Sequence, residues 1–398
     1  MRAGPLIARA AVAALLIHIG IQQVRYSLSY GNDVTWNTDQ FSEGNSIRAG
    51  HHYAVAGLWS NAGLPDVAYG PLLRDYGVTK KDPTLTTYVY THYPPGPDWL
   101  LGLLSMIFGP GEIVKFRMVR IAFALCFAAL LAILLDRGLG PVRGAIGFVA
   151  MVELPMFTQY MHGLSIQGWD FELLYLQLAI LLIVFGRSPC KLERREAIAL
   201  FVLGFLQGWV GFDYVFLLAL AAVPFWLLTS RRTETLPTLR RAIVWPVTGF
   251  VLACGLHFLQ VVIYYRGLQP AIRDLGGAAA HRADISAGIA EAKAVWLDYV
   301  LRRLPEGRYF GFSFVEFVIV LTVALALPFP KFHWNPARAS VAAFLASLAI
   351  ASLWVVIMKG HAIEHPHFIP RHFFMVYFFG VVLTLKAIRA PADLRATR

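Results

Sequence analysis

The chain has 398 residues, of which 57% are hydrophobic and 15% are charged, whereas about 25% of residues are charged in soluble domains. This composition excludes a soluble globular protein, a disordered chain and a collagen-like fibre, and it indicates an integral membrane protein. The formal net charge of +11 comes from short basic segments between apolar runs, which is typical of cytoplasmic loops. We therefore expect membrane lipids as neighbours and no nucleic-acid partner.

Apolar runs along the whole chain approach the roughly 20 residues that an α-helix needs to cross a bilayer. They are 5–22, 117–135, 144–160, 171–186, 197–212, 213–229, 242–264, 312–330, 339–358 and 372–389. The first run lacks a small-residue cleavage site and is interpreted as a retained span. A shorter run, 96–109, is bounded by Pro95 and Gly109 and is predicted to be re-entrant or interfacial. The sequence thus predicts an all-α polytopic bundle of about 10–11 transmembrane helices.

The charge of the loops predicts their orientation. Two to four Lys or Arg residues lie in each of the segments 136–143, 187–196, 230–241, 331–338 and 386–398. By the positive-inside rule these segments and both termini are cytoplasmic, so that 23–95 and 265–311 are long external loops. The second loop contains an amphipathic stretch, 285–304, which is expected to lie as a helix in the headgroup plane. We expect one membrane domain over 1–398, and the Arg- and Ala-rich ends favour a bacterial inner membrane with the active site on the periplasmic side.

The first external loop carries the most informative residues. Asp39 and Gln40 follow the first span, a helical segment runs from Glu43 to Trp59, and the loop returns to the membrane through His92-Tyr93-Pro94-Pro95. A carboxylate just outside a span, opposite an aromatic segment fixed by prolines, makes a wall for a site at the membrane surface. The alternative is a solvated Asp and prolines that only end a helix.

This order of features resembles the GT-C superfamily of membrane glycosyltransferases, and in particular the protein O-mannosyltransferase and aminoarabinose transferase branch. The resemblance implies a GT-C-like fold, a sugar donor linked to polyprenyl phosphate, and a glycan, lipid or protein acceptor. Asp39 matches the loop Asp that is the catalytic or substrate-orienting carboxylate of the family, with Asp33 as the alternative. Gln40 stands where a Glu is usual, which puts a two-carboxylate or metal-binding variant in doubt.

Three further stretches extend the resemblance along the chain. Asp170 matches an Asp of the second external loop of the family, and Asp213 stands where a Lys is common. The segment from Glu364 to Phe373 resembles the His/Glu-rich segment, with an Arg-aromatic pair, that opens the last span of lipid-linked mannosyltransferases. The resemblance therefore implies catalytic roles for Asp39 and Asp170. It implies substrate binding by His92, Tyr93, Glu364, His365 and Arg371.

The chemistry of transfer from a polyprenyl phosphate leads to the same residues. A general base must reach the acceptor hydroxyl, and Asp39 is our candidate. Cations must stabilise the departing phosphate, for which the planar fork of Arg371 is suited. His92 and His365 are candidates for contacts to the sugar or phosphate, and Asp170 for orienting the acceptor or the base. The prenyl tail needs an apolar groove, which 28 Phe and 10 Trp residues make easy to build.

Two other patterns point to different classes of protein. His361 to His365 fit the His-x-x-Glu-His pattern of zinc peptidases, but Pro366 disfavours the helical geometry that this pattern needs. We expect no zinc hydrolase and no certain cofactor, although a divalent cation is possible there. Glu153 and Glu316 lie within apolar runs, which is typical of a proton or ion path. A secondary transporter or flippase of a lipid-linked or small polar substrate is therefore the alternative function, and a non-catalytic assembly subunit is a third.

Overall fold

The computed structural model describes residues 3–34, 40–68, 87–152, 155–229, 232–283, 288–303, 338–364 and 369–387. Over these residues the regular elements are helices, apart from an isolated antiparallel bridge between Asp66 and Val89. The all-α prediction is therefore confirmed. Four features of the sequence lie outside the described residues: Asp39, Glu153, His365 and the predicted span 312–330 with Glu316.

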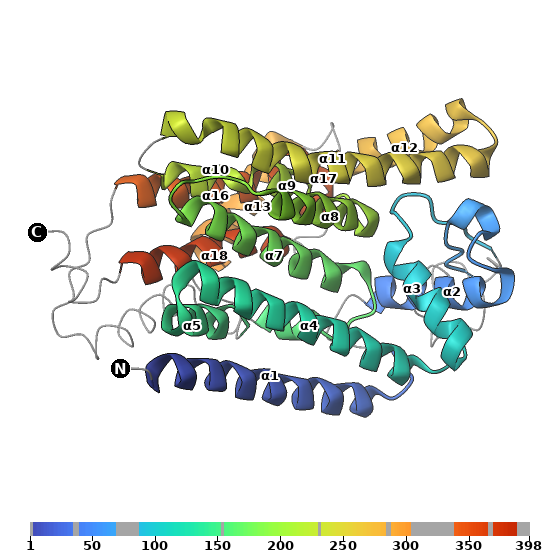
Figure 1. Cartoon of the computed structure of the whole chain (residues 1–398). Coiled ribbons are helices and arrows are strands. Elements are labelled where there is room, and N and C mark those ends of the chain that lie inside the picture. The colour runs from blue at the N-terminus through green and yellow to red at the C-terminus, as the bar shows by residue number, and fades with distance from the viewer. Residues whose placement is uncertain are drawn as a thin grey trace, which may run out of the picture.

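Five helices of the described part are long and apolar enough to cross a membrane. They are α1 (Ala3–Tyr30), α4 (Ile113–Leu139), α7 (Ile166–Gly186), α11 (Arg232–Tyr265) and α16 (Arg338–Ile357). These helices run along one another in the bundle and coincide with predicted apolar runs (Figure 1). The protein is thus a polytopic membrane protein, as its composition predicts.

Shorter helices occupy the remaining predicted runs of the described part. They are α5 (Pro141–Val152), α6 (Pro155–Tyr160), α8 (Arg194–Val210), α9 (Val215–Leu220), α10 (Ala222–Leu227) and α18 (Ile369–Ala387). The run 213–229 does not begin as a helix, because residues 211–214 form a turn between α8 and α9. The helix α1 begins and α18 ends at the same end of the bundle (Figure 1), which agrees with the expectation of both termini on one side.

The helices α7 and α18 form the centre of the hydrophobic core. Both are apolar nearly all round, which is the pattern of a helix surrounded by protein. Leu174, Leu181, Phe373 and Phe378 are completely buried in the same cluster. In the apolar window of α7 76% of the residues are buried, against 11% in that of α1, so that α7 is central and α1 peripheral.

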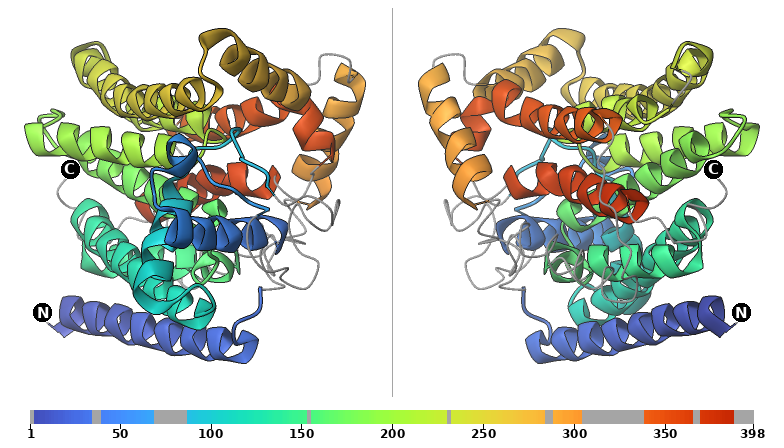
Figure 2. Two further views of the ribbon diagram at one scale, coloured as in Figure 1. Left: turned by 90° about the vertical axis from the view of Figure 1, so that its right-hand side faces the viewer. Right: turned by 90° about the vertical axis from the view of Figure 1, so that its left-hand side faces the viewer.

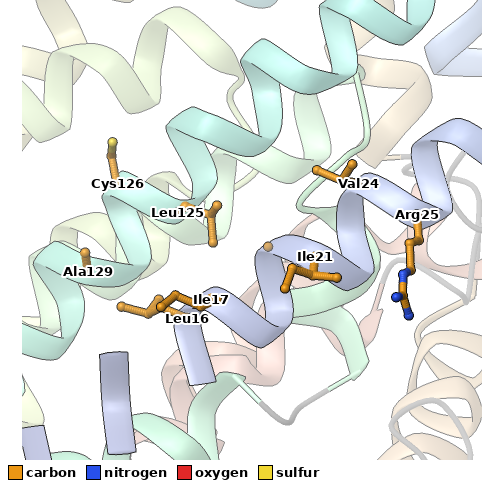
Figure 3. Close-up of a pocket in the computed structure, with 9 residues that line it drawn as sticks. Leu16, Ile17, Ile21, Val24, Arg25, Leu125, Cys126 and Ala129 are labelled. Atoms are coloured by element: carbon orange, nitrogen blue, oxygen red, sulfur yellow. The ribbon is translucent and has the colours of Figure 1, made fainter. Parts of the chain in front are cut away.

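The peripheral helix α1 leaves an apolar groove beside α4 (Figure 3). The groove has a volume of about 730 Å³, and the side chains drawn in Figure 3 come from α1 and α4. Within it, Gly20 of α1 faces Leu125 of α4, since a Cβ added at Gly20 would lie 3.1 Å from Leu125 Cδ1. Its lining is apolar except at Arg25 and Cys126, so that it has the character of a lipid-facing surface.

Glycines bring α8 and α11 into contact backbone to backbone. A Cβ at Gly204 would collide with the Pro246 carbonyl oxygen, and one at Gly249 with the Phe201 carbonyl oxygen. Small residues at such positions are the usual means of close packing between membrane helices. The close contact fixes the second half of α8 against α11, and the turn 211–214 follows this helix directly.

The first external loop forms a small helical layer at the end of the bundle opposite the two termini (Figure 1). It contains α2 (Gln40–Ala56) and the short 3-10 helix η1 (Ser60–Gly63), and α3 (Gly96–Phe108), which follows the loop directly, lies beside them. Seen from this end, α2 lies across the middle of the bundle (Figure 2). It packs closely on α3, because a Cβ at Gly50 would lie 2.9 Å from Leu101 Cβ. With 13 residues, α3 is shorter than a span, as predicted for the run 96–109.

The second external loop also contributes helices. They are α12 (Leu268–Ala283) and α13 (Ile289–Asp298), which continues into the short π-helix η3 (Tyr299–Arg303). The short helix α17 (Lys359–Glu364) comes later in the chain, between α16 and α18. The apolar side of the stretch 285–304 was expected to face lipid headgroups. In the structure Trp296 donates a 2.7 Å hydrogen bond to Ser352 Oγ of α16, and Tyr299 packs on Phe373 at 4.7 Å between ring centroids. This apolar side therefore covers the helix bundle.

Candidate active site

Charged and aromatic side chains from five separate parts of the chain meet in one group. They come from the return of the first external loop (Tyr90 to Tyr93), the start of α7, the turn 211–214, the end of α12 and the start of α18. None of these segments is adjacent to another in the sequence, so that the fold alone brings them together.

Asp213 lies at the centre of this group, in the turn between α8 and α9. It accepts a hydrogen bond from the Tyr93 hydroxyl and interacts electrostatically with the guanidinium groups of Arg371 and Arg282. Burial raises the pKa of Asp213, and the two guanidiniums and the hydrogen bond from Tyr93 oppose this without cancelling it. Asp213 thus holds its proton more strongly than a solvated Asp does.

Arg282, at the end of α12, lies against the aromatic side chains of the loop return. Its guanidinium carbon is 4.7 Å from the centroid of the Tyr93 ring, and it donates hydrogen bonds to Tyr93 and Tyr90. Burial lowers the pKa of Arg282, but the two tyrosines and Asp213 raise it by more. Burial also raises the pKa of Tyr90 to about 12 and that of Tyr93 further still. Both tyrosines are therefore hydroxyl donors at neutral pH.

Asp170 and Arg371 complete the group. Asp170, in the second turn of α7, is 2% exposed and accepts a 2.6 Å hydrogen bond from Gln207 Nε2 of α8. Arg371, in the first turn of α18, is 4% exposed and interacts electrostatically with both Asp170 and Asp213. Gly211 lies between Asp170 and the loop return, because a Cβ added there would be 3.8 Å from Asp170 Oδ2 and 4.0 Å from Tyr93 Cδ1.

Two helices, α12 and the membrane-spanning α11, hold the loop return in place. Thr91 Oγ1 donates a hydrogen bond to Asp274 of α12, and His92 Nε2 is 3.4 Å from the other oxygen of the same carboxylate. On the other side, His257 Nε2 of α11 donates a 2.8 Å hydrogen bond to the Thr91 carbonyl oxygen. The position of Tyr90 and Tyr93 thus depends on both α11 and α12.

Of the site residues predicted from the sequence, some lie in this group and others do not. Tyr93, Asp170 and Arg371 belong to one group, and His92 stands next to it against Asp274. Glu364 lies at the surface, where its Oε2 is 3.7 Å from His281 Nε2. Asp39 and His365 lie outside the described residues.

Neither Arg282 nor Asp274 is predicted from the sequence, in which Asp213 stands out only as a departure from a family pattern. Asp274 is 183 residues from Thr91, to which it is bonded. No spacing along the chain relates residues so far apart, and α12 carries a second arginine, Arg273, that looks the same as Arg282 in the sequence. A signal was present only for Asp213, as a carboxylate between two apolar runs.

No metal centre is formed by the described residues, in which no three His, Cys, Asp or Glu side chains lie close enough to share an ion. Of the His-x-x-Glu-His pattern, His361 and Glu364 lie on α17, and the edge of the His361 ring packs against Trp354 with 5.9 Å between the ring centroids.

Comparison with known proteins does not assign this chain to a family. No protein-family model and no curated protein sequence matches the chain. Among solved structures, the chain is similar to the crystal structure of ArnT from Cupriavidus metallidurans in the apo state, with 15% sequence identity and a TM-score of 0.41. The likeness covers 96% of this chain and 78% of that one. At such a score and identity it assigns no function, which has to be argued from the site.

Proposed function

We propose that the protein is a GT-C type glycosyltransferase that moves a sugar from a polyprenyl-phosphate donor to an acceptor at the extracytoplasmic face of the membrane. The observation that supports this most is that two carboxylates, two guanidiniums and two tyrosine hydroxyls form one group. They belong to Asp170 and Asp213, Arg282 and Arg371, and Tyr90 and Tyr93. Such a group, at the external side of a membrane bundle, offers the acid, base and cationic partners that transfer from a phosphate requires. We place the protein in a bacterial inner membrane with this site on the periplasmic side.

The roles follow from the chemistry of each group. Asp39 is the general base that accepts the proton of the acceptor hydroxyl as the bond to the anomeric carbon forms. Arg371 and Arg282 stabilise the charge on the phosphate as the bond to the sugar breaks, since guanidinium forks match phosphate oxygens. Asp170, held by Gln207, orients the acceptor. Asp213 keeps both guanidiniums in position.

An apolar groove next to the site supports a prenyl substrate. It has a volume of about 620 Å³ and is formed by the first external loop with α3, α8 and α11, through Trp59, Ala62, Trp99, Phe205, Trp209, Leu256, Leu259, Gln260 and Ile263. Trp209 lies two residues before Gly211, and Leu256 is next to His257, which holds the loop return. A tail in this groove would leave its phosphate near the charged group.

The test is sugar transfer by the purified protein in nanodiscs, with a panel of polyprenyl-phosphate sugars labelled in the sugar. We expect wild type to release polyprenyl phosphate from one donor of the panel, and the variants Asp39→Asn and Arg371→Gln to lose at least about a hundredfold in rate, the range expected of a general base and of an electrostatic stabiliser. Asp136→Asn is the matched control, because Asp136 pairs with Arg9 near the opposite end of the bundle.

Three outcomes would count against the proposal. Full activity of Asp39→Asn would remove Asp39 from the mechanism, and full activity of Arg371→Gln would do so for Arg371. Movement of a lipid-linked substrate across the bilayer without sugar transfer would favour the flippase instead.

A further inference from the structure

The helix α12 has two faces of different character. Its inner face consists of side chains at the three- and four-residue spacing of one helical face, none of which is exposed: Ala271, Asp274, Leu275, Ala278 and Arg282. Two of them belong to the candidate active site or to its support. Arg282 donates a hydrogen bond to Tyr93, and Asp274 accepts one from Thr91.

The outer face of α12 combines apolar and basic side chains. Leu268 and Ile272, one turn apart, are 57% and 52% exposed. Arg273 is next to Ile272, Arg266 lies in the turn before the helix, and both arginines are exposed. Neither arginine forms an ion pair with a carboxylate of the described residues. Aliphatic side chains flanked by unpaired cations are typical of a helix that lies in the headgroup layer of a bilayer.

The position of α12 along α11 agrees with this depth. The apolar run 242–264 of α11 ends just before Arg266, so that the turn into α12 comes where the hydrocarbon core ends. From there α12 lies beside α11 and does not lead away from it (Figure 1). Thr91 joins the two helices, because it is bonded both to Asp274 and to His257, about two turns before the end of α11. The outer face thus stays close to the membrane surface.

No other element of the described chain covers the outer face, since its side chains are exposed there. The stretch 285–304, expected from the sequence to lie on the headgroups, covers the helix bundle through Trp296 instead. With 16 residues, α12 is too short to be a span. At the membrane surface, Leu268 and Ile272 can reach the acyl-chain boundary while the guanidiniums stay among the phosphates.

The charge of the outer face selects among lipids. A zwitterionic headgroup carries no net charge, whereas an anionic headgroup leaves a negative surface potential that attracts exposed Arg side chains. Each guanidinium also matches the oxygens of a phosphate through its planar fork. Because Arg266 and Arg273 have no carboxylate to offset them, the chemistry of this face fits anionic lipids best.

We propose that the outer face of α12 docks into the headgroup layer and takes anionic phospholipids of the surrounding bilayer as its partners. These lipids are distinct from the sugar donor, so that their binding goes beyond the proposed function and does not depend on it. The contact supports from outside the helix whose inner face carries Arg282 and Asp274.

Quenching of a fluorophore on the outer face by labelled lipids is the test. The protein carries Ile272→Cys with Cys126, Cys190 and Cys254 replaced by Ser, and the new thiol is labelled with bimane. It is reconstituted in phosphatidylcholine vesicles that contain a nitroxide high on the acyl chain of either phosphatidylglycerol or phosphatidylcholine. We expect both lipids to quench, and the anionic one at least about twofold more strongly, because the cations enrich it locally.

Salt and two pairs of substitutions check the role of charge. At 1 M salt the difference between the lipids should vanish, since the screening length falls to about 3 Å. It should also vanish in the double variant Arg266→Gln and Arg273→Gln. The matched control, Arg240→Gln with Arg241→Gln, removes two exposed cations toward the other end of α11 and should keep the difference. The salt experiment replaces no arginine, so that it decides the charge dependence even where a variant folds poorly.

Three outcomes would overturn the proposal. Absence of quenching by either lipid would place the outer face in water. Equal quenching by the two lipids at low salt would remove the assignment to anionic lipids. Energy transfer from bimane to an acceptor on the same thiol of other copies, without quenching by lipid, would show that a second copy of the chain covers this face. None of these outcomes depends on sugar transfer.

Discussion

Arg117 on α4 shows how a single residue positions the first external loop. Arg117 donates hydrogen bonds to the carbonyl oxygens of Gly31 and Asp33 and pairs with Glu43 of α2. These partners lie on the two sides of the segment that contains Asp39. Arg117 thus holds both attachments of this segment to the bundle.

Glu43→Gln is expected to destabilise the protein by about 3–5 kcal/mol, because it leaves the completely buried guanidinium of Arg117 without its carboxylate. The free energy of unfolding in detergent measures the effect. Glu112→Gln serves as control: Glu112 pairs with Lys115 at 3.1 Å, both side chains are about half exposed, and the loss should stay below about 1 kcal/mol. Equal losses in the two variants would show that the buried pair contributes no more to the free energy of unfolding than the exposed pair does.

Asp98 gives a prediction for pH. In α3, which is too short to span the membrane, burial raises the pKa of Asp98 to about 7, opposed by a hydrogen bond from Ser46. An unfolded Asp titrates near 3.9, so that between these pH values the folded state binds more protons than the unfolded state, and stability falls as the pH rises. We expect the melting temperature of wild type to fall from pH 4 to pH 7 more steeply than that of Asp98→Asn. Parallel curves would contradict this.

Single residues could be predicted from the sequence only where the local pattern was unusual. Asp170, Tyr93 and Arg371 stand out as polar residues at the ends of apolar runs, and the structure places them in one group. Arg282 and Asp274 have no such pattern. Their importance comes from partners about 180 residues away, and those contacts exist only in the folded chain.

At the scale of helices, hydrophobic runs located the spans but not their neighbours. The apolar side of α13 is visible in the sequence, yet periodicity alone does not tell protein from headgroups as the surface that it meets. The same holds for α8 and α11, whose contact depends on glycines that the sequence does not pair.

Gly249→Ala is therefore expected to lower stability by about 1–3 kcal/mol or more, because the added methyl group would collide with the Phe201 carbonyl oxygen. Gly255→Ala, on the same helix with open space around it, should be neutral or stabilising by up to about 1 kcal/mol. Melting curves of the two variants in one detergent make the comparison. A stable Gly249→Ala protein would mean that the two helices can separate at little cost.

At the scale of the whole molecule, the arrangement predicts which surfaces face each side of the membrane. The helix α1 begins and α18 ends at one end of the bundle, while α2 and α3 lie at the other (Figure 1). Cys190 lies in the basic segment between α7 and α8, and Cys126 and Cys254 lie within α4 and α11.

With Cys126 and Cys254 replaced by Ser, a membrane-impermeant maleimide should label Cys190 only after the cells are opened. Ser60→Cys in η1, with Cys190 also replaced, should be labelled in intact spheroplasts. Gel shifts of the two proteins report the result. The opposite pattern would invert the proposed orientation and place the candidate active site in the cytoplasm.

The attachment of the first external loop to α11 makes the site sensitive to the thickness of the bilayer. With 34 residues, α11 is about 51 Å long, whereas the hydrocarbon core measures about 30 Å. Near its outer end, His257 and Gln260 bond to the carbonyl oxygens of Thr91 and Ala62. A long helix meets a thinner bilayer by tilting. Because the loop return is bonded to the helix that tilts, we expect the acyl-chain length of the host membrane to change the alignment of the proposed catalytic groups.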